Sequence, residues 1–163
     1  MAWFVNILLI AAAFNAEEWL VKREMLSREA ERLQQAYSEC VKKLESPAEG
    51  VNIPVETYPD GSVKLEITAS RAQFFLKEEL VWAEDVEIVR YEDDHTVSSR
   101  IKAERCVFDR NTKSGWAEGA AKIVFKDTEF TGNGVYFSSP ENYVMSKENS
   151  KIVSHDLKFG GVL

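Results

Sequence analysis

The sequence predicts a mainly β protein, with an elongated antiparallel β-structure preceded by an N-terminal hydrophobic segment and an amphipathic helix. Three observations predict it. A strand–turn–strand unit recurs along the second half of the chain, apolar and polar residues alternate after Gly50, and the period before Gly50 is helical. A short repeated unit of strands cannot bury its apolar face alone, so it has to stack on its neighbours.

The first segment, residues 1–16, contains an apolar run from residue 2 to 14 that ends before Glu17 and Glu18. A helix that spans a bilayer needs about 20 apolar residues, so this run is short for one. Its length suits a secretory signal, and the three alanines at 11–13 offer a small-residue cleavage site, although no Lys or Arg precedes the run. We expect residues 1–16 to be a signal peptide or a membrane anchor. A buried first helix is the alternative.

Residues 17–46 have the period of an amphipathic helix. Apolar residues follow a heptad seam that only Arg23 interrupts, and Ser46, Pro47 and Gly50 end the segment. The seam consists of Trp19, Leu26, Ala30, Leu33, Tyr37, Cys40 and Leu44. Two roles are open: a stalk or coiled-coil pairing segment between a membrane and the domain, or a helix that lies on the apolar surface of its own domain.

Residues 51–163 form the β domain. Val63, Leu65 and Ile67 alternate with Lys64 and Glu66, as on a half-buried strand. We expect further strands at residues 70–76, 80–91, 97–108, 114–125, 129–138, 142–146 and 150–158, with turn residues between them and no helical period.

The repeat has three copies, at residues 69–89, 103–125 and 132–153. The first two are offset by 34 residues at Trp82 and Trp116 and by 35 at Ile88 and Ile123, which indicates a bulge. Equivalent positions should form ladders across the strands. The expected ladders are Phe74, Phe108 and Tyr136; Trp82, Trp116 and Val144; and Ile88, Ile123 and Ile152.

These copies resemble the OstA-type repeat of the periplasmic lipopolysaccharide-transport (Lpt) proteins. The shared pattern is small-x-Arg-small-x-Phe, a turn, Ala-Glu-Gly-x-Ala-x-Ile-x-Phe, and then a glycine shortly before a Phe, here Gly132-Asn-Gly-Val-Tyr-Phe137; residues 103–137 carry it best. The order of hydrophobic segment, connector and repeats is similar to the inner-membrane-anchored LptC-like branch, while the long heptad helix departs from the pattern. The resemblance implies a folded-over β-jellyroll that is open along one seam, is located in the periplasm or anchored in the inner membrane, and receives the acyl chains of a lipid.

If the sheet folds over itself, the inward member of each alternating pair lines its interior. The expected lipid-binding groove consists of Leu65, Ile67, Phe74, Ile88, Phe108, Ile123, Phe125, Phe137 and Val144. The alternative is that these side chains pack together as an ordinary hydrophobic core that binds no ligand. An open stack also leaves unpaired strand edges that can accept a partner's strand. In the resembling family such ends join head to tail, so we expect docking to other transport proteins near Ile152, Val153 and Leu157.

Composition and motifs exclude several other functions. The net charge of −7 opposes binding to nucleic acid. No nucleophile elbow, P-loop or dinucleotide fingerprint occurs, so we expect no enzyme activity and no cofactor. His95 and His155 fall in polar loops, so we expect no metal site. Cys40 and Cys106 occupy apolar positions that indicate two small buried side chains, and the sequence leaves open whether they pair.

Two functional hypotheses therefore stand. The first is a lipid (lipopolysaccharide) transport component that holds acyl chains in an apolar groove and docks head to tail with its partners. The second is a structural β-stack that binds no ligand and self-assembles through its coiled-coil helix.

Overall fold

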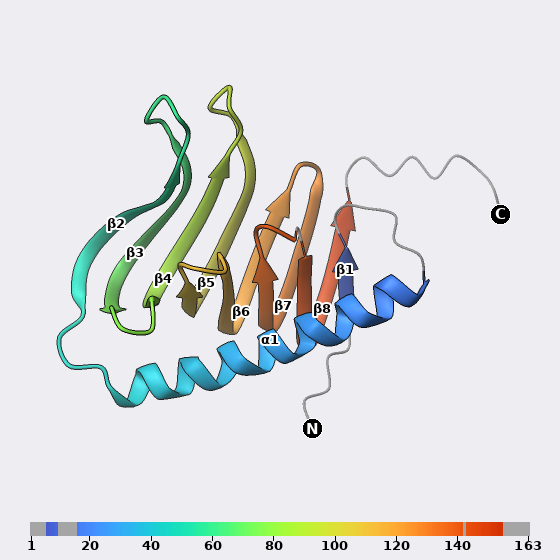
Figure 1. The fold of residues 1–163 in the computed structure, drawn as a ribbon, viewed down its shortest axis with the longest axis horizontal. Helices are drawn as coiled ribbons and strands as arrows, with labels where there is room; N and C mark the ends of the chain where they lie inside the picture. The colour runs from blue at the N-terminus through green and yellow to red at the C-terminus, as the bar shows by residue number, and fades with distance from the viewer. Residues whose placement is uncertain (1–5, 10–15, 142, 155–163) are drawn as a thin grey trace.

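The computed structural model describes residues 6–9, 16–141 and 143–154, which form one curled antiparallel sheet and one long helix (Figure 1). The sheet has the strand order β1-β8-β7-β6-β5-β4-β3-β2, so that each strand from β2 to β8 pairs with its neighbour in the chain. The elements are β1 (Asn6–Leu9), α1 (Ala16–Lys42), β2 (Ala48–Thr57), β3 (Val63–Phe75), β4 (Leu80–Tyr91), β5 (Val97–Asp109), β6 (Ser114–Phe125), β7 (Thr128–Ser138) and β8 (Tyr143–Ser154).

The predicted mainly β, antiparallel architecture is confirmed, and four of the expected strands agree with β4 to β7 to within one residue at each end. Strand β2 was not predicted, because its burial alternates weakly and Pro54 interrupts it. Segments expected as two strands are single long strands at β3 and at β8. The reason is that the alternation slips inside these strands while the backbone pairing continues.

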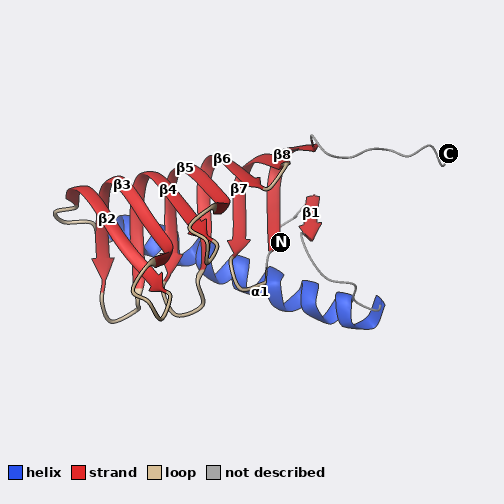
Figure 2. Ribbon diagram, turned by 90° about the horizontal axis from the view of Figure 1, so that it is seen from above, coloured by secondary structure: helices blue, strands red, loops and turns tan. Residues whose placement is uncertain are grey.

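This slip recurs in every central strand and marks a fold line across the sheet, which we call the crease. Inward-facing residues step by two along each strand, but by three between Ala83 and Val86 and between Ala103 and Cys106. At the crease Asp85 and Gly119 adopt positive φ angles of 48° and 83°. The register is irregular here between β5, β6, β7 and β8. The strands consequently bend over, as the view from above shows (Figure 2).

The crease explains the small residues of the repeat. The inward residues that flank it include Ala72, Ala83, Ala103, Ala117 and Ala121, all buried in one cluster. Small side chains leave room for the two halves of each bent strand to approach. The extra residue of β6 lies in the step from Ala117 to Ala121, so the bulge predicted from the 34- and 35-residue offsets is confirmed.

The register confirms one ladder and corrects one member in each of the other two. Ile88, Ile101, Ile123, Phe130 and Ile152 are successive partners across the sheet, as expected. Phe108 shares its inward ladder with Phe137, through Gly115, and not with Tyr136. Tyr136 instead pairs with Trp116 on the opposite face, and its neighbour in β8 is Met145, not Val144. Both errors have one cause: Tyr136 and Val144 are each one residue away from the true ladder members, Phe137 and Met145, and a shift of one residue reverses the face to which a side chain points.

Helix α1 runs across one end of the strands (Figure 1) and covers the outward face there. The heptad-seam residues Leu26, Ala30, Leu33, Tyr37 and Cys40 are buried with Trp82, Val107, Trp116, Tyr136, Tyr143 and Met145 of the sheet. Acidic residues in its first turn and Lys42 in its last complement the helix dipole. The sequence left two roles open for this helix, a stalk and a helix packed on its own domain. The heptad residues pack against the sheet of the same chain, which is the second of these roles.

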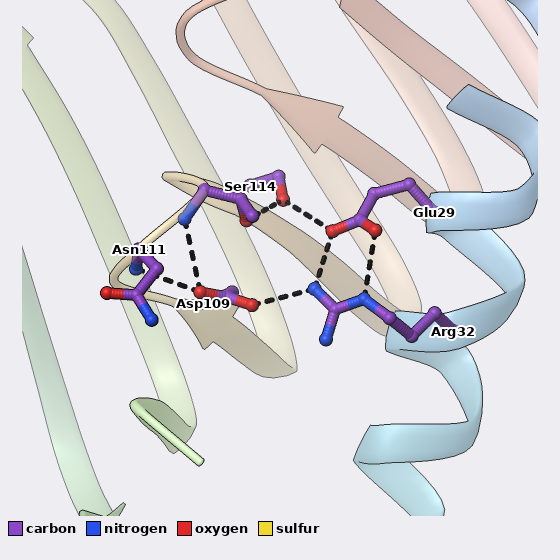
Figure 3. Close-up of polar contacts among 6 residues, drawn as sticks. Glu29, Arg32, Asp109, Asn111 and Ser114 are labelled. Atoms are coloured by element: carbon purple, nitrogen blue, oxygen red, sulfur yellow. Dashed lines mark hydrogen bonds and ion pairs between the residues drawn. The ribbon is translucent and has the colours of Figure 1, made fainter. Parts of the chain in front are cut away.

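A polar cluster fixes the helix to the β5–β6 turn (Figure 3). The Arg32 guanidinium donates hydrogen bonds to Glu29, and to Asp109 Oδ2 at 2.7 Å. Asp109 Oδ1 accepts the backbone N–H groups of Asn111 and Thr112 at 2.8 and 3.1 Å. The hydrogen bond to Glu29 is the largest influence that raises the pKa of Arg32. The helix is therefore held by ionic as well as apolar contacts.

The N-terminal segment contributes β1, whose residues Asn6 to Leu9 pair with Ser146 to Tyr143 of β8. The other positions of residues 1–15 lie outside the described residues, so a signal peptide or anchor here stays a prediction. Within the part of the chain that the structure describes, no helix has both the length and the apolar character that crossing a bilayer requires.

Candidate functional site

The interior of the bent sheet is a continuous apolar surface shared by the two halves of each strand. We call the half that carries α1 on its back the helix-side half, and the half beyond the crease the distal half. One cluster of buried residues contains members of both: Leu65, Ile67, Val86, Ile88, Ala103, Ile123 and Phe130 from the distal half, and Val81, Cys106, Phe108, Val135, Phe137 and Val144 from the helix-side half. The two halves thus form the walls of one interior.

Seven of the nine expected groove residues lie in this interior and are buried. They are Leu65, Ile67, Ile88, Phe108, Ile123, Phe137 and Val144. The rings of Phe108 and Phe137 stack with their centroids 6.3 Å apart. Phe130, Ile53 and Ile101 also belong to this interior. They were missing from the expected set although their position in the alternation could have identified them.

The remaining two expected residues, Phe74 and Phe125, lie at the margin of the interior. Phe74 is 39% exposed, and Phe125 is half-buried beneath Lys126, whose Nζ lies 5.4 Å from the ring centroid. Leu76, which follows β3 at its helix-side end, and Val97, which begins β5 at its distal end, are exposed at 74% and 45%. Exposed apolar side chains therefore accompany the ends of the strands that bound the interior.

The two halves approach each other again along this margin, which we call the seam. Here a small cavity of about 40 Å³ is lined by Arg90, Ser99, Ile101, Ile123 and Phe125 of the distal half and by residues 137–139, 143 and 144 of the helix-side half. Its volume is close to that of one water molecule. The two walls are therefore closely packed at the seam, as their side chains are in the buried interior behind it.

Arg90 joins the two sides of the seam. Arg90 follows Ile88 by two residues on the inward face of β4, and its Nη1 donates hydrogen bonds to the Ser139 carbonyl oxygen at 3.0 Å and to Ser139 Oγ at 3.4 Å. Its inward direction could be inferred from its phase with Ile88. Its contact with Ser139 could not, since 49 residues separate the two.

A larger hollow, of about 560 Å³, lies along the crease. Its lining includes Asp85, Glu87, Lys102, Glu104 and Lys122. Glu87 forms ion pairs with Arg100 and Lys102. A lining so rich in charge is a poor solvent for acyl chains, because desolvating charged groups costs free energy. The packed interior behind the seam matches an apolar ligand better.

Two of the three expected docking residues, Ile152 and Val153, lie on the outermost long strand, β8. β1 covers β8 only at residues 143–146, and among the described residues no strand pairs with the outer side of residues 147–154. Ile152 is 47% exposed and Val153 is half-buried. Ile152 ends the inward ladder that runs from Ile53 through Ile67 and Ile88, so the interior continues to this edge. Leu157 lies outside the described residues.

The cysteine and histidine side chains offer little chemistry. Cys106 is buried in the interior, and Cys40 of α1 is buried between the helix and the outward face, so the two free thiols lie on opposite sides of the sheet. Burial raises the pKa of Cys106 to about 12 and that of Cys40 to about 11. His95 lies in the exposed β4–β5 turn, and His155 lies outside the described residues. The described residues include no group of three potential metal ligands.

Comparisons with known proteins find similarity only at the level of structure. No protein-family model matches the sequence, and no curated protein matches it either. The chain is similar to the crystal structure of LptH from Pseudomonas aeruginosa, the LptA homologous periplasmic component of the lipopolysaccharide transport device. The two share 9% sequence identity with a TM-score of 0.49, over 66% of this chain and 92% of that one.

Proposed function

We propose that this protein is a lipid-transport component of the cell envelope that holds the acyl chains of lipopolysaccharide, or of a similar lipid, between the two halves of its folded sheet. The observation that carries the proposal is the interior itself. It is apolar on both walls, it follows the whole length of the strand stack, and it is bounded by a seam that Phe125 and Phe137 help to line.

The driving force is the desolvation of the lipid. Each methylene that leaves water for an apolar site contributes about 0.8 kcal/mol, so a chain of about twelve carbons needs no polar contact to bind. The walls are packed against each other, so the seam has to part before a chain can replace the contacts between them. The free energy of binding is then the difference between lipid–wall and wall–wall contacts.

Partner docking extends this proposal. The outer side of residues 147–154 presents backbone groups that a partner's edge strand can pair with, and Ile152 would continue the inward ladder into that partner. The repeat's resemblance to periplasmic lipopolysaccharide-transport proteins supports a periplasmic location and a head-to-tail arrangement with other such proteins. An inner-membrane anchor at residues 1–16 belongs to the same proposal.

A second candidate function is a structural β-stack without a ligand, which the packed state of the interior favours. The cavity at the seam has room for about one water molecule, so the two walls already bury each other's apolar side chains there. The heptad residues of α1 are buried on the helix's own sheet, so self-assembly of such a stack would not use α1 as a coiled coil.

One matched pair of variants separates the two functions. Phe125 and Val124 are adjacent in β6, both half-buried, and point to opposite faces. Binding of N-phenyl-1-naphthylamine, followed by fluorescence, should fall at least tenfold in Phe125→Asp and stay within twofold in Val124→Asp, with both variants folded by circular dichroism. Equal binding in the two folded variants would refute the lipid-carrier function, and absence of binding in the unmodified protein would favour the structural stack.

A further inference from the structure

Among the described residues, the cavity at the seam has one charged residue, Arg90, in an otherwise uncharged lining. The other lining residues are the apolar Ile101, Ile123, Phe125, Phe137 and Val144, the aromatic Tyr143, and three serines at 99, 138 and 139. A guanidinium therefore stands where the apolar interior meets the solvent, which is where the polar end of an amphiphile would lie if its chain were inside.

The position of Arg90 follows from the strand pattern. β4 directs Val86, Ile88 and then Arg90 to the inward face, so the guanidinium continues the row that lines the interior. Ser99 is the direct partner of Arg90 across β4 and β5, and Phe125 is the next partner in β6. At the seam, the guanidinium of Arg90, the hydroxyl of Ser99 and the ring of Phe125 therefore lie side by side on three neighbouring strands.

The acceptors on the opposite side of the seam include a peptide carbonyl and a hydroxyl, both of Ser139. Hydrogen bonds from a guanidinium to a carboxylate or a phosphate are roughly twice as strong as those between neutral groups. An anionic oxygen that reached the seam would therefore compete successfully with Ser139 for Arg90. Exchanging Ser139 for such a ligand would also remove the hydrogen bonds that join the two halves.

We propose that Arg90 is the head-group site of the seam: it selects amphiphiles whose polar end is a phosphate or carboxylate, and it releases Ser139 when such a ligand binds. This inference rests on the proposed lipid-binding function, and it adds the chemical class of the ligand's polar end. The guanidinium accordingly has two states, bound to Ser139 in the closed seam and bound to the anion in the loaded one.

The test compares ligands of equal chain length in competition with N-phenyl-1-naphthylamine, all below their micelle concentrations. Dodecyl phosphate and dodecanoate should bind about tenfold more tightly than dodecanol to the unmodified protein. Arg90→Gln, which keeps a donor for the Ser139 carbonyl, should reduce this preference to less than about threefold without weakening dodecanol binding. Arg90→Lys should restore part of it.

Lys126→Gln is the matched control, since it removes the same charge from the neighbouring ring of Phe125 but not from the lining of the seam cavity. It should keep the full preference. An unchanged preference in folded Arg90→Gln, an equal loss in Lys126→Gln, or equal binding of all three ligands to the unmodified protein would overturn the head-group site while leaving lipid binding intact. If none of the three binds, the proposed lipid-binding function fails and the head-group site fails with it. Inorganic phosphate alone should not displace the probe, because it lacks the chain that reaches the interior.

Discussion

Arg32 of α1 and Asp109 at the end of β5 form an ion pair with 2.7 Å between Nη2 and Oδ2, across 77 residues of sequence. The Asp109 side chain is 7% exposed and the Arg32 side chain 47%. Removing the arginine leaves a nearly buried carboxylate with one partner fewer. Arg32→Met should therefore lower the free energy of unfolding by about 1–2 kcal/mol, a value reduced from that of a fully buried pair by solvent screening.

The measurement is urea denaturation followed by tryptophan fluorescence. Arg28→Met is the control, because its pair with Glu24 leaves both side chains more than 60% exposed. That variant should change stability by less than about 0.5 kcal/mol. Equal effects in the two variants would show that the Arg32–Asp109 contact does not hold the helix to the sheet.

Packing of the heptad seam gives a second prediction. Leu33 is fully buried between α1 and the sheet, whereas Leu20 on the same helix is 60% exposed. Leu33→Ala should destabilise the protein by about 3 kcal/mol, and Leu20→Ala by less than about 0.5 kcal/mol. If Leu33 mediated a coiled coil between copies, its replacement would instead lower the molar mass measured by light scattering and leave the monomer's stability unchanged.

The sequence predicted this helix and the central strands because both signals are local. The periods of two and of heptads repeat over many residues, and the turn residues at 77–79, 92–94 and 109–112 mark the ends of the strands. What it could not predict depends on distant contacts. The choice between a stalk and a packed helix rests on whether Leu33 meets Trp116 of the sheet, and the faces of Phe137 and Tyr136 depend on slips at the crease.

Close packing at Gly115 gives a third prediction. A Cβ at this position would collide with the Phe137 ring and lie 2.9 Å from the Val107 carbonyl oxygen. Gly115→Ala should cost about 2 kcal/mol of stability through overpacking. Phe137→Leu should be less damaging in the Gly115→Ala background than alone, because the smaller side chain relieves part of the collision. A double-mutant cycle in thermal or urea unfolding measures this coupling, and additive effects would contradict the contact.

Thiol reactivity gives a fourth prediction. Burial raises the pKa of Cys40 to about 11 and of Cys106 to about 12, from a usual value near 9. At pH 8 neither folded thiol should react with Ellman's reagent, and both should react in denaturant. Because the folded pKa values are raised, the neutral thiols favour the folded state fully below pH 9, and this stability is lost as the pH rises above 9 towards 11–12. Rapid reaction of the native protein at pH 8 would show that these sites are open.

The location of a bound acyl chain tests the central claim most directly. Doxyl-labelled stearate, titrated into methyl-labelled protein, broadens NMR signals of nearby methyl groups. Ile88 and Ile123 face the interior, while their neighbours Val89 and Val124 point to the opposite face of the same strands. We expect the isoleucine methyl signals to broaden first and the two valine signals to persist. Broadening of the valines with the isoleucines unaffected, or no broadening at all, would contradict a lipid-holding interior.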